Sequence, residues 1–325
     1  MSRLKLLLIG SLVVAIAGGL WGYWKYTSVY PSTRDAYVQA HIVSVAAEIT
    51  GKVAAVHVGD NAHVAKGDPL FDIDDTTYQS AVKQAQAQVD SARAAITANQ
   101  SEIDAAQAGV ASAQSARQAA EAQLARIQTL FERGNAPKST LDDTRSAAAS
   151  AKAAVNSELA ALTRARAALT SSRDALAVAE ATLAIAQTNL ARTHVTAPAD
   201  GWVTNLDLRI GSPVTAYRPL FAVVDDSDWW IEANFKETDL PRIREGQPVK
   251  VAVDLLPGQT LTGTVASLAR GSGSTFALLP AENASGNWVK VTQRFAVRIA
   301  LDPSDADLRV GASATATIDT TGSAQ

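Results

Sequence analysis

The sequence of 325 residues contains no cysteine, one methionine and only four histidines. The absence of cysteine excludes a disulfide framework, a thiolate metal site, a cysteine nucleophile and a lipid-modified N-terminal cysteine. The formal net charge is −3, so the protein lacks the excess of basic residues that is typical of nucleic-acid-binding proteins. None of the histidines has a helical i, i+4 partner, so the ligand count for a histidine metal site falls short. We therefore expect no metal, no cofactor, no nucleic-acid partner and no enzymatic activity.

A charge-free run extends from Leu6 to Trp24, about 19 residues, which is enough to cross a bilayer as a helix. Arg3 and Lys5 precede it, so the positive-inside rule places the N-terminus in the cytoplasm and the bulk of the chain across the membrane. A cleaved signal peptide is the less favoured alternative, because the run is long and is followed by a poor cleavage site. Residues 1–26 are thus predicted to form a cytoplasmic tip and a single transmembrane anchor.

Residues 76–192 are nearly a third alanine and contain one proline, Pro137, near the centre. Alanine is the best helix former and proline the worst, which predicts two long helices joined by a tip at about 133–139. Gly134 suits the left-handed position after the first helix. Ser139 and Asp142 fit a capping box at the start of the second. Before the first helix, we expect the carboxylates of Asp72, Asp74 and Asp75 to cap free N–H groups.

Large apolar residues recur every seven positions on both sides of this tip, which indicates a coiled-coil seam. If the chain folds back at about residue 136, the two series meet pair by pair, as an antiparallel hairpin requires. Arg117 interrupts the first series and is expected to extend its guanidinium into solvent. The predicted seam, paired from the outside inward, consists of Val82 with Leu190, Val89 with Leu183, Ile96 with Leu176, Ile103 with Leu169, and Val110 with Leu162.

The segments on either side of the hairpin resemble each other without gaps. Residues 47–75 and 197–225 share a glycine at Gly51 and Gly201, and both carry a Pro-Leu-Phe triplet near the end. Apolar and polar residues alternate between glycine and proline turns, which is typical of strands. Neither segment has enough apolar surface for a core of its own. We therefore expect two half-motifs, 41–75 and 193–226, to pack as one β-sandwich into which the hairpin is inserted.

Short alternating runs continue from Asp228 to about Thr320, separated by glycine and proline. This pattern predicts an antiparallel β-barrel over residues 227–320. Residues 27–40 are expected to supply a linker and the first barrel strand, and residues 321–325 a disordered tail. The predicted fold class is α+β: one N-terminal transmembrane helix, a split sandwich interrupted by a coiled-coil hairpin, and a C-terminal barrel.

The split sandwich resembles the biotinyl/lipoyl-like domain of the HlyD/EmrA-type membrane fusion proteins. The segments Thr33–Val38, Ala197–Leu206 and Gly271–Ile299 are similar to the EmrA branch of that family, and the resemblance covers nearly the whole chain. It implies a periplasmic adaptor, held in the bacterial inner membrane, for efflux of small hydrophobic toxic compounds. The implied partners are an inner-membrane major-facilitator transporter, a TolC-like outer-membrane channel, and further copies of the chain in a trimer or hexamer.

Family members that dock on a TolC-type channel often carry an Arg–Leu–Ser pattern at the hairpin tip. Arg126 and Leu130 match the first two positions, whereas the serine position falls on Pro137 and a serine follows at Ser139. The resemblance thus implies an outer-channel contact at these four residues, with the third element displaced or lost. An ordinary solvated helix charge explains Arg126 equally well.

Three other functions remain open on the sequence alone. An adaptor of an ABC-type (type I) secretion system would share the same architecture. A biotinyl or lipoyl carrier subunit is disfavoured, because the hairpin stands where a carrier has its modifiable lysine. A purely structural coiled coil of the cell envelope would need no transporter at all.

Overall fold

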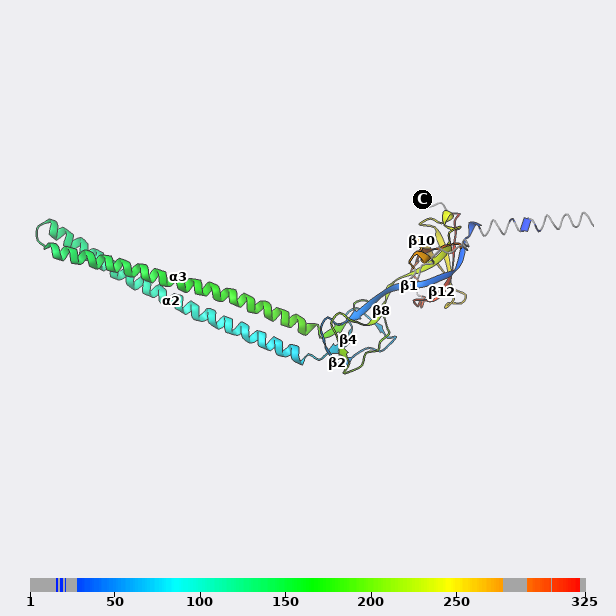
Figure 1. The fold of residues 1–325 in the computed structure, drawn as a ribbon, viewed down its shortest axis with the longest axis horizontal. Helices are drawn as coiled ribbons and strands as arrows, with labels where there is room; N and C mark the ends of the chain where they lie inside the picture. The colour runs from blue at the N-terminus through cyan, green and yellow to red at the C-terminus, as the bar shows by residue number, and fades with distance from the viewer. Residues whose placement is uncertain are drawn as a thin grey trace, which may run out of the picture.

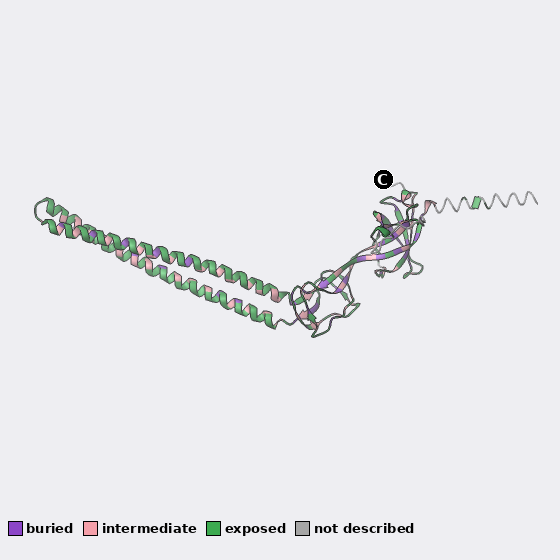
Figure 2. Ribbon diagram, in the orientation of Figure 1, coloured by how far each residue is buried: buried purple, intermediate pink, exposed green. Residues whose placement is uncertain are grey.

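The computed structural model describes residues 16, 18, 19, 21, 28–276, 291–304 and 306–321. Figure 1 shows an elongated molecule in which a long helical hairpin, a small β domain and a β-barrel follow one another. The predicted mixture of two long helices with separate β domains is confirmed. Figure 2 shows that burial is concentrated in the two β domains and along the line where the helices touch.

The predicted transmembrane anchor lies almost entirely outside the described residues. Of the run Leu6–Trp24, only Ile16, Gly18, Gly19 and Trp21 are described. Within the described part of the chain, no helix is both long enough and apolar enough to span a bilayer.

Two helices form the hairpin, α2 (Thr76–Glu132, 57 residues) and α3 (Lys138–Ala191, 54 residues). At 1.5 Å per residue the longer one extends about 85 Å. The end of α2 is a Schellman motif: Gly134 has a φ of 75° and its N–H donates to the Phe131 carbonyl at 2.9 Å, while the Asn135 N–H donates to Leu130 at 2.9 Å. The prediction of a left-handed Gly134 is therefore confirmed.

The predicted capping box at the start of the second helix is wrong. Pro137 is the N-cap, with φ −75° and ψ 152°, and no side chain caps the helix. Ser139 consequently lies within the first turn. A proline is tolerated here because its missing N–H would have had no partner at a helix start, so α3 begins directly after it.

The two half-motifs interleave to form the β-sandwich. The first contributes β2 (Gly51–Val56), β3 (His63–Val64) and β4 (Pro69–Ile73); the second contributes β5 (His194–Thr196), β6 (Gly201–Thr204), β7 (Pro213–Val214) and the start of β8 (Pro219–Lys236). Each short strand pairs with a strand of the other half: β2 with β7, β3 with β6, and β4 with β5. Neither half therefore completes a sheet alone.

Matched residues of the repeat meet in the sandwich core. Phe71 and Phe221 lie edge to face with their ring centroids 6.0 Å apart, and both are buried. The matched glycines are required by close packing. A Cβ on Gly51 would clash with the Ile73 side chain, and a Cβ on Gly201, whose φ is 151°, would clash with the Val224 carbonyl. The repeated glycines thus mark positions where another strand passes too closely for a side chain.

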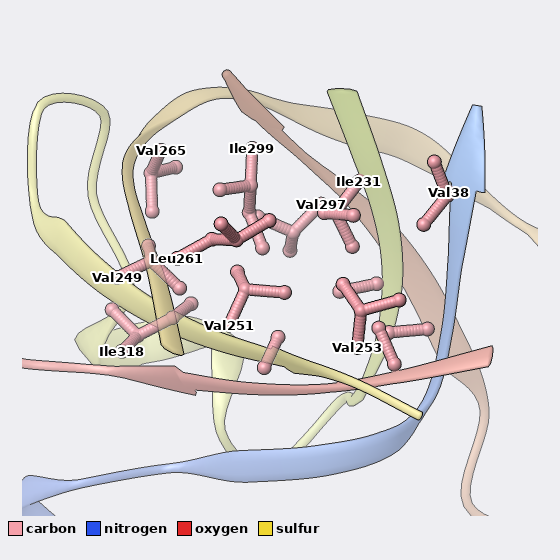
Figure 3. Close-up of a cluster of buried hydrophobic side chains, with 14 of the residues drawn as sticks. Val38, Ile231, Val249, Val251, Val253, Leu261, Val265, Val297, Ile299 and Ile318 are labelled. Atoms are coloured by element: carbon pink, nitrogen blue, oxygen red, sulfur yellow. The ribbon is translucent and has the colours of Figure 1, made fainter. Parts of the chain in front are cut away.

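Six antiparallel strands close the barrel, in the order β1-β12-β9-β10-β11-β8, with β8 pairing back to β1. Its core is filled by branched aliphatic side chains such as Val251, Ile231 and Ile299, which point inward in Figure 3. Two 3₁₀ turns, η1 (Leu240–Arg242) and η2 (Gly273–Phe276), lie in the connections. The remaining strands are β1 (Ser32–Ala46), β9 (Pro248–Val253), β10 (Thr260–Ser272), β11 (Arg294–Leu301) and β12 (Ser313–Ile318).

Strands β1 and β8 belong to both β domains. They pair antiparallel from Ala36 opposite Ala233 to Ala46 opposite Pro219, with a register shift between Ala40 and Ile42. Figure 1 shows this ribbon running from the barrel into the sandwich. The two domains are therefore joined by hydrogen-bonded strands rather than by a loose linker.

Candidate functional site

The hairpin tip presents the four residues that the sequence assigned to a channel contact. Arg126 is exposed, and its guanidinium donates to the Gln123 side chain at 2.5 Å on the same helix. Leu130 lies one turn further on and is 41% exposed. Pro137 and Ser139 are exposed on the opposite side of the turn. The tip thus offers an exposed cation beside an exposed apolar side chain, a combination suited to contact with another protein.

The seam residues face the space between the two helices, and the extent of their burial varies along it. Ile103 and Val110 of α2 form one buried cluster with Leu162 and Leu169 of α3, and Ile96 packs against it. Val89 is buried as well, whereas the outermost positions are half-buried, namely Val82, Leu176, Leu183 and Leu190. Arg117 extends along its own helix and pairs with Glu121 at 3.0 Å.

A second row of small and polar residues completes the seam, and the sequence reasoning missed it. Asn99 of α2 donates to the Ser172 hydroxyl of α3 at 2.5 Å, and Ala85 is 3% exposed. Just outside this row, Arg93 pairs with Glu180 at 3.2 Å. Ala85, Asn99 and Ser172 each follow a large apolar seam residue by three positions, so the heptad spacing itself was the available signal. A polar pair inside the seam favours one register over its neighbours.

At the base of the hairpin, one carboxylate joins three separate segments. Asp72 of β4 contacts His57 Nε2 at 2.6 Å and His194 Nδ1 at 2.7 Å. His57 follows β2, and His194 opens β5 directly after α3. Partial burial raises the pKa of Asp72, but hydrogen bonds from His194 and His57 outweigh this effect and bring the pKa below its usual value. We call this group the root triad; it ties the strand that leads into α2 to the strand that leaves α3.

The root triad corrects the role expected for Asp72. It does not cap α2. Asp74 does accept a bond from a free N–H, that of Thr76 at the start of α2, and another from the Thr76 hydroxyl, so the expectation is confirmed for Asp74; the Asp75 carboxylate accepts a bond from the Gln79 side chain. No side chain caps α2 at its N-cap, Asp75. Across the described ranges, no group of three or more histidine, aspartate or glutamate side chains is arranged to hold a metal ion.

Two family models match the chain over most of its length. The RND MFP barrel-sandwich hybrid domain matches residues 41–226, and the AAEA-like beta-barrel domain matches residues 228–321. The chain belongs to the membrane fusion protein family. Its members are adaptor proteins rather than enzymes. The resemblance to membrane fusion proteins of the EmrA type is thereby confirmed.

This membrane fusion protein is also similar to individual curated relatives and to solved structures. It is 32% identical to the multidrug export protein EmrA of Haemophilus influenzae, over 97% of this chain and 83% of the relative. It is 38% identical to the fatty acid resistance protein FarA of Neisseria gonorrhoeae, over 89% of this chain and 75% of FarA. The crystal structure of MacA from Actinobacillus actinomycetemcomitans is similar with a TM-score of 0.61, over 88% of this chain and 78% of MacA, at 21% identity. The likeness to MacA concerns the fold alone.

Proposed function

We propose that this membrane fusion protein is the periplasmic adaptor of a tripartite multidrug efflux system. It links an inner-membrane major-facilitator exporter to a TolC-like outer-membrane channel, through which small hydrophobic toxic compounds leave the cell. The observation that carries the proposal is the similarity to the multidrug export protein EmrA over 97% of this chain and 83% of EmrA. The relative EmrK of Escherichia coli, named a probable multidrug resistance protein, is 34% identical over 98% of this chain and supports the same class.

The shape of the chain supports a spanning role. A hairpin of about 85 Å adds reach without adding a core that could enclose a catalytic site. Its seam buries few residues, and most of its surface is exposed (Figure 2). An adaptor needs such length to bring two membrane partners together across a gap.

We place the barrel next to the inner membrane. The charge-free N-terminal run leads into β1, the first barrel strand, and the Arg242 guanidinium donates to the Ser28 carbonyl at 2.6 Å, which ties the segment after the run to the barrel. In this arrangement the N-terminus is cytoplasmic, the bulk of the chain is periplasmic, and the hairpin points toward the outer membrane. The working form is a homo-oligomer, a trimer or hexamer, because several adaptors are needed to surround one export path.

The outer-membrane channel binds at the hairpin tip through Arg126, Leu130, Pro137 and Ser139. The exposed Leu130 supplies apolar contact area, and the Arg126 guanidinium supplies hydrogen-bond donors for carbonyl or carboxylate groups of the channel.

The experiment that tests the function is deletion of the gene, followed by complementation, with the susceptibility of cells to hydrophobic toxic compounds as the readout. We expect the deletion to sensitise the cells and the native gene to restore resistance. Unchanged susceptibility would instead favour a structural coiled coil. Co-purification with an ATP-binding transporter would favour the secretion adaptor.

The tip contact is tested in the same strain with two leucines of equal exposure. Leu130→Asp at the tip should abolish resistance, because it places a charge in the apolar contact with the channel. Leu159→Asp, in the middle of α3 at 42% exposure, is the matched control and should retain resistance. Equal effects of the two variants would show that the tip is not the channel contact.

A further inference from the structure

A cleft of about 440 Å³ lies between the β-sandwich and the barrel. Residues of β6 and β8 line one side, and the loop 307–310 before β12 lines the other. Its volume falls within the range of roughly 300–1,000 Å³ that is usual for small-molecule sites, which form preferentially between domains. The hairpin and its tip take no part in this cleft.

Two tryptophans give the cleft aromatic walls. Trp202 of β6 is 45% exposed, so much of its indole remains open to a ligand. Its ring is held by His63, which meets it edge to face with the centroids 5.1 Å apart, and His63 is held in turn by Asp226 at 2.9 Å. Trp229 of β8 packs partly against the barrel core. Both indoles are therefore positioned before any ligand arrives.

Acidic residues outnumber basic ones among the residues that line the cleft and those next to them in sequence. Asp307 lines it, and Asp60 accepts a hydrogen bond from the lining residue Asn61 at 3.1 Å. Hydrogen bonds from the Ser227 hydroxyl and N–H lower the pKa of Asp225 below its ordinary value. Arg309 also lines the cleft, but its guanidinium lies 3.5 Å from the Asp307 carboxylate. Two further carboxylates, Asp226 and Asp228, lie with Asp225 on the stretch of β8 between the lining residues Val224 and Trp229.

We propose that this cleft binds small planar aromatic cations. The open face of an indole attracts a cation through its quadrupole, and tryptophan does so most strongly of the aromatic side chains. The surrounding carboxylates raise the local concentration of positively charged ligands. An aromatic anion would meet the same walls but would be repelled by the acidic surroundings. The inference deepens the proposed function, on which its biological meaning rests, by naming one class of compound that the adaptor would hold.

Binding is tested on the full chain in nanodiscs of zwitterionic lipid, with ethidium as the planar cation and empty nanodiscs as the blank. Fluorescence anisotropy should show saturable binding to the native protein. Trp202→Ala should raise the Kd for ethidium by roughly tenfold, which is the scale of a desolvated cation–π contact. Because Trp202 is 45% exposed and is not part of the buried sandwich core, this variant is expected to fold.

Charge reversal provides an independent variant that does not depend on the tryptophan. Asp307→Lys alters a carboxylate that is 72% exposed, and it should also raise the Kd for ethidium by roughly tenfold while improving binding of the anion anilinonaphthalene sulfonate. Two controls match these changes: Tyr217→Ala removes an even more exposed aromatic residue of the same domain, and Asp104→Lys makes the same charge change on α2. Both controls should leave the Kd unchanged.

The outcome decides between a built site and general surface adsorption. If Trp202→Ala and Asp307→Lys bind ethidium as the controls do, or if the native protein prefers the anion, the proposal is overturned. The result is separate from the test of the adaptor function. Ethidium binding that depends on Trp202 would stand even if deletion of the gene left susceptibility unchanged, and loss of resistance on deletion would stand even if the cleft bound nothing.

Discussion

The hairpin and the β domains hold their chains together in different ways. In the barrel and the sandwich, buried side chains from many strands form one continuous core in each domain. In the hairpin, the buried residues are spread along the seam: Ile103, Val110, Leu162 and Leu169 form one small cluster, and others such as Val89 and Val155 lie apart from it. Each seam residue contacts only its counterpart across the gap and its near neighbours. A change in a β domain is therefore expected to affect the whole domain, whereas a change in the hairpin acts over a few turns.

The largest effect is expected from Phe71→Ala in the sandwich core. Phe71 is fully buried against Phe221, and loss of a buried aromatic ring costs about 3–5 kcal/mol of unfolding free energy. Denaturant unfolding followed by tryptophan fluorescence measures this loss. Tyr217→Ala, which removes a 75% exposed ring, is the control and should cost little. A loss below about 1 kcal/mol for Phe71→Ala would contradict the view of a cooperative sandwich core.

The next effect is expected from Leu162→Asp in the hairpin. It places a carboxylate opposite Val110 in the seam, where Leu162 is only 8% exposed, and should cost roughly 3 kcal/mol. Helicity measured by circular dichroism should fall while tryptophan fluorescence, which reports on the β domains, stays unchanged. Leu159→Asp lies on the exposed face and should leave helicity intact. Unchanged helicity for Leu162→Asp would argue against the pairing of the two series.

A smaller effect is expected at the junction of the two regions, from Asp72→Asn. The pKa of Asp72 is lowered in the folded state, so its stabilising contribution is fully present above the ordinary value of 3.8 and is lost as the pH falls through the folded pKa. The variant should thus be less stable than the native protein by about 1 kcal/mol at neutral pH, and the difference should shrink in strong acid.

Urea unfolding at neutral pH and in strong acid measures the effect of Asp72→Asn. Asp104→Asn, on the outer face of α2, is the control and should change little at either pH. A difference between the native protein and Asp72→Asn that is independent of pH would assign the effect to packing rather than to the carboxylate charge.

The smallest effect has the opposite sign. Gly109 lies inside α2, and a Cβ there would meet only the end of the flexible Glu158 side chain, at 2.7 Å. Gly109→Ala should therefore stabilise the hairpin by about 0.5–1 kcal/mol, because alanine loses less backbone entropy in a helix than glycine does. A rise in the thermal midpoint of helicity would be the evidence. A fall would mean that Glu158 cannot move aside. Gly201→Ala, where the obstacle is the Val224 backbone, should destabilise the sandwich.

Much of the architecture could be predicted because its signals are local. Alanine content, the single proline and the seven-residue period lie within one stretch of chain, and each follows from the geometry of one helix. The repeat of the two half-motifs was also visible, since matched glycines and the Pro-Leu-Phe triplets recur in order. The start of α3 was predicted wrongly because serine and proline both suit a helix start, and only the backbone angles of Pro137 decide between them.

The root triad and the cleft had no comparable signal. His57, Asp72 and His194 come from three segments, one of them separated from the others by the entire hairpin. The pairing of β2 with β4 brings His57 to Asp72, and the pairing of β4 with β5 adds His194. The cleft likewise depends on how β1 and β8 carry the sandwich next to the barrel. The spacing of residues along the chain does not predict such contacts, since they depend on long-range strand pairing.

The sequence by itself determined the hairpin, because helix propensity and heptad spacing act over a few residues and the chain folds back at a single turn. It also determined that two weak β segments must pair, because neither could bury enough apolar surface alone. The tertiary structure alone decided which strands interleave, that β1 and β8 run through both β domains, and which charged side chains meet at the root and around the cleft. These features depend on strand register and domain packing, in which residues more than a hundred positions apart become neighbours.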